Sequence, residues 1–277
     1  MPDTYFTVET SADREWFLPT EFARGPWDAG ATHGGPPTAL LARAAEHALP
    51  ELPLARLTVE LLRPVPMAGF SIDTEVIKAG RATGTTRSVI VDGDGDGDGD
   101  GDGDGSLRAV ATGMHILRSR VPLFPATLDN SGLVTPRLAD AVPGDFPISR
   151  IRHDQFGFSR SVTTRYPADE TSAPGVTTVW METIAVLPGE EPSPFQRICP
   201  LADCGNAFSR HAEPDRVQFI NADLTVALHR DPVGTWMGSR VWSHWQPSGI
   251  GLADALLFDD EGPVGRALQT LLLRPAA

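Results

Sequence analysis

Hydrophobic and polar residues alternate along several segments of this chain, most clearly between Phe219 and Arg230. Within this segment, apolar residues occupy every second position at Leu224, Val226 and Leu228. A β-strand places such residues on one face, and Asp223 then falls on the opposite face. The segment is therefore predicted to be a strand with one buried face and one polar face.

The same pattern predicts further elements along the whole chain. Two short strands are expected near residues 5–8 and 15–18. Longer strands are expected near 54–63, 70–79, 85–91, 107–117, 156–164, 176–187, 217–229, 235–245, 250–258 and 264–273. An almost continuous run of Ala and Leu predicts a helix from Thr38 to Leu49, which follows Pro36 and Pro37 and stops before Pro50. A second helix is expected to begin near Leu201 or Asp203.

One of these segments repeats an earlier one. Residues 57–65 match residues 224–232 at five of nine positions, with a constant offset of 167. The same offset places residues 89–92 on residues 256–259, and both segments end in Asp. A chance match of one short strand would not be expected to continue in this way, so the sequence indicates an internal duplication.

The duplication divides the chain into two units of similar size. We expect one unit at residues 1–118, a Pro-containing linker with weak periodicity at 119–147, and a second unit at 148–277. In each unit, one helix would lie against a mainly antiparallel sheet. The predicted fold class is therefore α+β, with the same unit present twice.

Composition limits the classes of partner and the location. Hydrophobic residues make up 41% of the chain, and no run approaches the roughly 18 apolar residues of a membrane span. The N-terminal segment lacks the basic start and apolar centre of a secretory signal. We therefore expect a cytoplasmic protein without a membrane partner. Cys199 and Cys204 match no zinc pattern and are expected to be ordinary buried thiols.

The formal charge of −13 argues against a nucleic-acid partner, since phosphate binding needs a basic face. Seven of the negative charges lie in an Asp–Gly alternation at residues 92–104. An EF-hand calcium loop would need a Glu at its twelfth position, which no register of this repeat supplies. The repeat is interpreted as a flexible loop between strands, and no metal site is predicted.

Several short motifs, taken in order, resemble those of double-hotdog acyl-CoA thioesterases of the thioesterase II family. The segments that carry this resemblance are His33–Gly35, Leu61–Pro64, Leu201–Asn206, Leu228–Arg230 with Asp223, and Ala267–Thr270. The resemblance spans nearly the whole chain. It implies two fused hotdog units, in each of which a sheet wraps around a central helix, and an enzyme that cleaves acyl-CoA thioesters without a metal or a cofactor. It leaves open a homo-oligomer of double hotdogs.

The resemblance also implies roles for individual residues. The acid of the family falls on Asp223 and its Gln falls on Gln269, so these two are the expected catalytic residues. A family Thr that helps to hold the attacking water falls on Ala253, which has no hydroxyl. Asn206 is expected to line the pocket. Asp203 fits a helix N-cap as well as a site residue, because Asp is a favoured cap.

Thioester hydrolysis explains why such residues would be needed. A carboxylate must take a proton from water, and donors must face the oxyanion that develops on the carbonyl. Asp223 would be the base and Gln269 would orient the water. Amides at the start of a helix, from Gly34 and Gly35 or from Gly205 and Asn206, would polarise the carbonyl.

Two other interpretations compete with this one. A protein that kept the pocket but lost the Thr hydroxyl would bind an acyl group or acyl-CoA without cleaving it, and the fold alone does not separate the two functions. The spacing of Asp28 and His33 resembles the Asp–His pair of hotdog enoyl-CoA hydratases, although the Asn–Pro between them is absent. Because this Asn–Pro is absent, His33 is expected to have a local hydrogen-bonding role instead.

Overall fold

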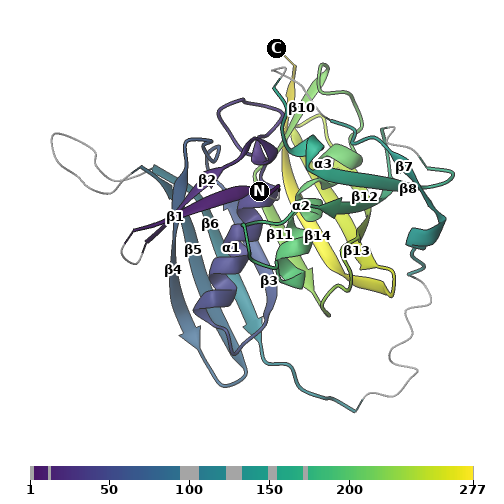
Figure 1. The fold of residues 1–277 in the computed structure, drawn as a ribbon. Coiled ribbons are helices and arrows are strands. Elements are labelled where there is room, and N and C mark those ends of the chain that lie inside the picture. Colours follow the sequence, from purple (N-terminus) through teal and green to yellow (C-terminus); the bar gives the residue numbers. More distant parts are fainter. Residues whose placement is uncertain are drawn as a thin grey trace, which may run out of the picture.

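A computed structural model of the chain describes residues 3–11, 14–93, 106–122, 133–148, 155–170 and 174–276. In these residues, 14 strands form one sheet whose paired strands are antiparallel, and the helices pack on one face of it. The helices α1 (Gly35–Ala48) and α2 (Pro194–Asp203) contact each other near the middle of the molecule, where the two halves of the chain meet (Figure 1).

The first half contributes six strands. They are β1 (Phe6–Ser11), β2 (Arg14–Pro19), β3 (Leu54–Leu61), β4 (Phe70–Ala79), β5 (Thr83–Asp92) and β6 (Ser106–Ile116). Burial alternates along β5, where every second residue from Gly84 to Ile90 is buried. This alternation confirms the strand that was predicted there. Helix α1 packs across β3 to β6 and shields their apolar face, as its Ala- and Leu-rich composition predicts.

The second half contributes the remaining strands and a short helix. They are β7 (Ala141–Gly144), β8 (Val162–Pro167), β9 (Thr177–Thr183), α3 (Gly205–Phe208), β10 (Val217–Asn221), β11 (Asp223–Leu228), β12 (Met237–Trp245), β13 (Ile250–Asp259) and β14 (Gly262–Pro275). Strand β7 pairs with β8. The last part of the stretch 119–147, which the sequence assigned to a linker, therefore contributes an edge strand to the second unit.

The two halves join through β3 and β11, the strands that carry the internal repeat. Thr58 lies opposite Thr225, and the Oγ1 atoms of the two residues are 3.1 Å apart. These two Thr are also equivalent at the sequence offset of 167. A pair of equivalent residues facing each other is the arrangement expected across a two-fold axis, so the halves are related as two copies of one unit. The predicted α+β class with a duplicated unit is confirmed.

The second helix begins earlier than predicted. Ser193 is the N-cap of α2, its Oγ accepts a hydrogen bond from Gln196 N at 3.1 Å, and Pro194 occupies the first helical position. The expected start near Leu201 or Asp203 is therefore wrong, and Asp203 is the last residue of α2 rather than its cap. A Ser followed by Pro is a recognised helix start, so Ser193 and Pro194 were the sequence signal for the observed start of α2.

The predicted strand at 217–229 is broken at Ala222. Asn221 lies opposite Leu271 of β14, whereas Thr225 lies opposite Leu268, so the register shifts by one residue between them. A one-residue shift moves every following side chain to the other face of the sheet. As a result, Phe219 and Asn221 face the same side as Leu224, the side that the helices cover.

Gly35 lets α1 and α2 approach backbone to backbone. A Cβ atom built on Gly35 would lie 2.8 Å from Pro200 Cα, which cannot move away as a flexible side chain would. We expect Gly35→Ala to lower the free energy of unfolding by about 3 kcal/mol, measured by urea denaturation. Gly30→Ala is the matched control, because the same methyl group would meet only Asp28 Oδ1 at 3.5 Å. Equal midpoints for the two variants would contradict this packing.

Candidate functional site

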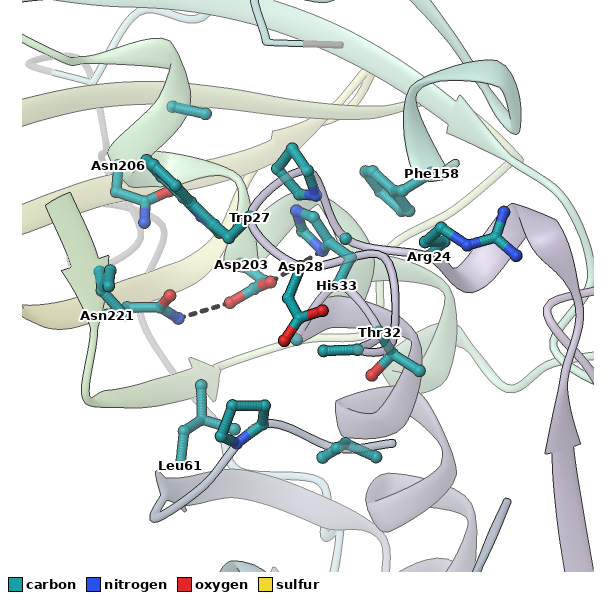
Figure 2. Close-up of a pocket in the computed structure, with 18 of the residues that line it drawn as sticks. Arg24, Trp27, Asp28, Thr32, His33, Leu61, Phe158, Asp203, Asn206 and Asn221 are labelled. Atoms are coloured by element: carbon teal, nitrogen blue, oxygen red, sulfur yellow. Dashed lines mark hydrogen bonds and ion pairs between the residues drawn. The ribbon is translucent and has the colours of Figure 1, made fainter. Parts of the chain in front are cut away.

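A cavity of about 370 Å³ lies at the junction of the two units. The first unit lines it with residues of the loop that leads into α1 and with the end of β3, and the second lines it with α2, α3 and β10. Most of its wall is apolar, and the aromatic residues are Trp27, Phe146, Phe158 and Phe219. Figure 2 shows the polar side chains that gather in this wall, with Asp203 between Asn221 and His33.

Asp203 is the carboxylate at the centre of this group. Its position at the end of α2 leaves it only 4% exposed. Its Oδ1 accepts a hydrogen bond from Asn221 Nδ2 at 2.7 Å, and its Oδ2 lies 2.9 Å from His33 Nδ1 (Figure 2). A buried carboxylate is stable only with such partners, and here they come from both halves of the chain.

Gln269 lies directly behind Asp203, on the buried face of β14. Its Nε2 donates to the main-chain carbonyl of Asp203 at 2.9 Å and lies 3.4 Å from Oδ1 of the same residue. Its Oε1 accepts from the main-chain amide of Asn206 at 3.0 Å. The side chain therefore satisfies backbone groups at the break between α2 and α3, where helix ends leave donors and acceptors without helical partners.

Gly34 and Gly35 bring the start of α1 against the carboxylate. A Cβ atom built on Gly34 would lie 3.0 Å from Asp203 Oδ2, so the backbone packs closely on that oxygen. The positive end of the dipole of this 14-residue helix faces the same group. Gly35 N–H lies 3.2 Å from His33 Nδ1, and the next two residues, Pro36 and Pro37, have no N–H.

Gly205, Asn206 and Ala253 surround Gln269. A Cβ atom built on Gly205 would lie 2.8 Å from Gln269 Oε1 and 3.7 Å from Ala253 Cβ. Ala253 is buried and pairs with Gln269 across β13 and β14. Of these, only Asn206 lines the cavity. The small residues leave room for the amide of Gln269 to contact the break between the two helices.

The structure does not bring Asp223 and Gln269 together. Asp223 is on the outer face of β11, opposite Glu60 of β3, and its Oδ1 accepts a hydrogen bond from Thr270 N. Its neighbour Leu224 is fully buried on the inner face, which is the face that carries Gln269. The sheet itself therefore separates Asp223 from the cavity.

Two members of the site were missed by the sequence reasoning. Asn221 was placed within a continuous strand, and only the one-residue shift at Ala222 turns its side chain toward Asp203. His33 was expected to bond locally. Its carboxylate partner is Asp203 and not Asp28, whose Oδ1 accepts from Gly30 N at 2.8 Å. The spacing of Asp28 and His33 resembles that of a hydratase Asp–His pair, but the two side chains do not form such a pair here.

The two cysteines lie behind the site and are free and buried, as predicted. Burial raises the pKa of both thiols well above the usual value, and the nearby charge of Asp203 raises it further. Both thiols thus stay protonated, and a protonated thiol is a poor nucleophile. Among the described residues, no group of three or more His, Cys, Asp or Glu is arranged to hold a metal ion.

Comparisons with known proteins agree with this architecture. A model of the acyl-CoA thioesterase N-terminal domain matches residues 23–114, and one of the acyl-CoA thioesterase C-terminal domain matches residues 136–273. No curated protein matches the sequence. In the part of the chain that the structure describes, no helix combines the length and apolar character needed to cross a membrane.

Solved structures share the fold at low sequence identity. An acyl-CoA thioesterase II from Mycobacterium marinum is 17% identical over 97% of this chain and 94% of its own, with a TM-score of 0.60. A tesB protein from Mycobacterium avium subs paratuberculosis is 14% identical over 97% and 96%, with a TM-score of 0.66. A protein with a hot dog fold from Alicyclobacillus acidocaldarius is 15% identical over 98% and 96%, with a TM-score of 0.70. At these identities, the likeness shows the fold.

Proposed function

We propose, because this chain belongs to the acyl-CoA thioesterase family, that it hydrolyses acyl-CoA thioesters with a water molecule activated by Asp203 at the junction of its two hotdog units. The observation that carries this proposal is a buried carboxylate, held by donors from both units, in the wall of a mostly apolar cavity. Such a cavity with few polar groups is typical of a small-molecule site.

The partners of Asp203 leave it able to act as a base. An ionised carboxylate has about four lone-pair positions. Asn221, Gln269 and His33 approach three of these positions, which leaves one for a water molecule on the cavity side. Because the surrounding donors are already in place, the carboxylate needs little rearrangement when it takes a proton.

The start of α1 supports stabilisation of the oxyanion. Gly34 lines the cavity and packs on Asp203, so a carbonyl oxygen bound there would meet the positive end of the helix. The alternative donor, the amide of Asn206, is bonded to Gln269 Oε1 at 3.0 Å, whereas the amide of Gly35 has only the longer contact of 3.2 Å with His33 Nδ1. We therefore assign stabilisation of the oxyanion to the amides of Gly34 and Gly35. Gly205, Ala253 and Gln269 have a supporting role, because they help to fix the position of Asp203.

The reaction then follows from these positions. The water oxygen attacks the thioester carbonyl carbon while Asp203 takes one of the water protons. The tetrahedral intermediate collapses by cleavage of the carbon–sulfur bond, and the proton passes from Asp203 to the departing thiolate. The products are a carboxylic acid and the thiol of CoA. The aromatic wall formed by Trp27, Phe158 and Phe219 would hold the acyl group.

Release of free thiol from acyl-CoAs of different chain length tests this function. We expect the protein to release CoA from at least one acyl-CoA at a rate that is proportional to protein concentration. A sample without substrate corrects for the two cysteines of the protein. Ala253, which has a methyl group where the resemblance expects a hydroxyl, favours a non-catalytic acyl-CoA binding protein as the second candidate. Saturable binding by calorimetry with no thiol release from any chain length would establish that alternative.

A further inference from the structure

His33 is held rigidly at the point where the two units meet. Its ring stacks on Phe158 of the second unit, with the ring centroids 4.0 Å apart and an interplanar angle of 12°. Phe158 is only 2% exposed and also packs edge-on against Phe146. The imidazole of the first unit is therefore oriented by aromatic residues of the second unit, next to Asp203.

The proton between His33 and Asp203 can be placed from the distances. His33 Nδ1 lies 2.9 Å from Asp203 Oδ2 and 3.2 Å from Gly35 N. One ring nitrogen cannot donate to the carboxylate and accept from the amide at the same time. A hydrogen bond to an ionised group is roughly twice as strong as a neutral one. The shorter contact to the carboxylate therefore favours a proton on Nδ1.

We propose that His33 is a positioning residue, which donates its Nδ1–H to Asp203 and holds this carboxylate aimed at the attacking water. Asp203 is supplied by the second unit and His33 by the first, so the site is complete only when both units are joined. This inference rests on the proposed function, because it assigns a role in the same hydrolysis.

Other charged groups also line the cavity near the pair. The remaining charged or titratable side chains in the cavity lining, as far as the structure describes it, are Arg24, Asp28 and Arg63. Asp28 bonds to Gly30 N, and Arg24 donates to the carbonyls of Ala29 and Phe156. Within this lining, His33 and Asp203 thus form the contact between an imidazole and a carboxylate. The thiols of Cys199 and Cys204 stay protonated and add no charge behind it.

Two substitutions of His33 separate positioning from structure. In His33→Ala the donor is lost, and we expect kcat to fall about 10- to 100-fold with KM within about threefold. In His33→Asn the side-chain Nδ2 occupies the place of Nδ1 and donates in its stead, so we expect kcat within about fivefold of the native value. Recovery of kcat in His33→Asn, where only the donor is restored, is a result that a purely structural role of the ring would not produce.

His211→Asn is the matched control. His211 also packs against an aromatic ring, that of Trp245, but edge-on. Its Nε2 lies 2.7 Å from Ser243 O, and it does not line the cavity. We expect its kcat and KM to match those of the native protein. Thermal unfolding of all three variants shows whether each one folds. If His33→Ala does not fold, the tautomer of His33 in the native protein still decides whether Nδ1 is the donor.

The tautomer of His33 provides a test that does not depend on activity. In ¹⁵N NMR spectra of the native protein near neutral pH, we expect the signal of a ring protonated on Nδ1. A proton on Nε2 alone would overturn the proposal, as would full activity in His33→Ala. Absence of thiol release from the native protein would refute the proposed function instead, and the NMR result would still decide which nitrogen donates.

Discussion

Replacing Asp203 by Asn is expected to lower thiol release about 100- to 10,000-fold, which is the contribution of a general base. Asn has nearly the same shape, and its amide oxygen can still accept the hydrogen bond that Asn221 donates to Oδ1 at 2.7 Å. It cannot take a proton from water. The loss should therefore appear in kcat at an almost unchanged thermal midpoint, measured with the acyl-CoA that the native protein cleaves fastest.

Asp223→Asn is the control for that experiment, and it also decides between two assignments of the base. Asp223 lies on the outer face of the sheet, where its Oδ1 accepts from Thr270 N, a bond that Asn can keep. We expect its activity to stay within about twofold of the native value. If Asp223→Asn were inactive and Asp203→Asn active, the assignment made from the sequence would be right and the one made from the structure would be wrong.

Replacing Gln269 by Leu is expected to affect both stability and activity. The change leaves the amide of Asn206 and the carbonyl of Asp203 without the side chain that now bonds to them at 3.0 Å and 2.9 Å. Each buried polar group left unpaired costs about 1–3 kcal/mol, so the free energy of unfolding should fall by about 2–6 kcal/mol in total. Because the end of α2 then relaxes, kcat should fall about 100-fold. Urea denaturation and the thiol assay measure the two effects.

Gln218→Leu is a control for the change from Gln to Leu. Gln218 lies on β10, is half-buried and does not line the cavity. We expect little change in either measurement. A Gln269→Leu variant that loses activity while its unfolding curve is unchanged would contradict the claim that Gln269 acts by tying the two helices together. It would favour instead a direct contact between this amide and the reacting water.

The alternation of residues was sufficient to predict most strands, because one face of each strand must be buried. It placed β4 at the residues where the structure has it, and Leu224 and Val226 are fully buried as predicted. The alternation placed Asp223 correctly, but the face of Gln269 became known only from the structure. Asp223 is on the face opposite Leu224, whereas Gln269 lies between the exposed Leu268 and Thr270 and so faces the core.

The break at Ala222 was not available from the pattern. A strand that continued without a shift would place Asn221 on the outer face together with Asp223 and Thr225. The one-residue shift in pairing with β14 reverses this and turns Asn221 toward Asp203. Such a shift depends on which strand lies beside the segment, and that information is absent from the segment itself.

The order of residues was enough to predict the fold class, the duplication and the family, because burial imposes a period on every strand and because the same unit occurs twice at an offset of 167. The composition of the site depended instead on how the two units pack. His33 and Asp203 are 170 positions apart and belong to different units, yet their side chains meet at 2.9 Å. A contact of this kind arises from the packing of α1 against α2, which no local pattern of residues specifies.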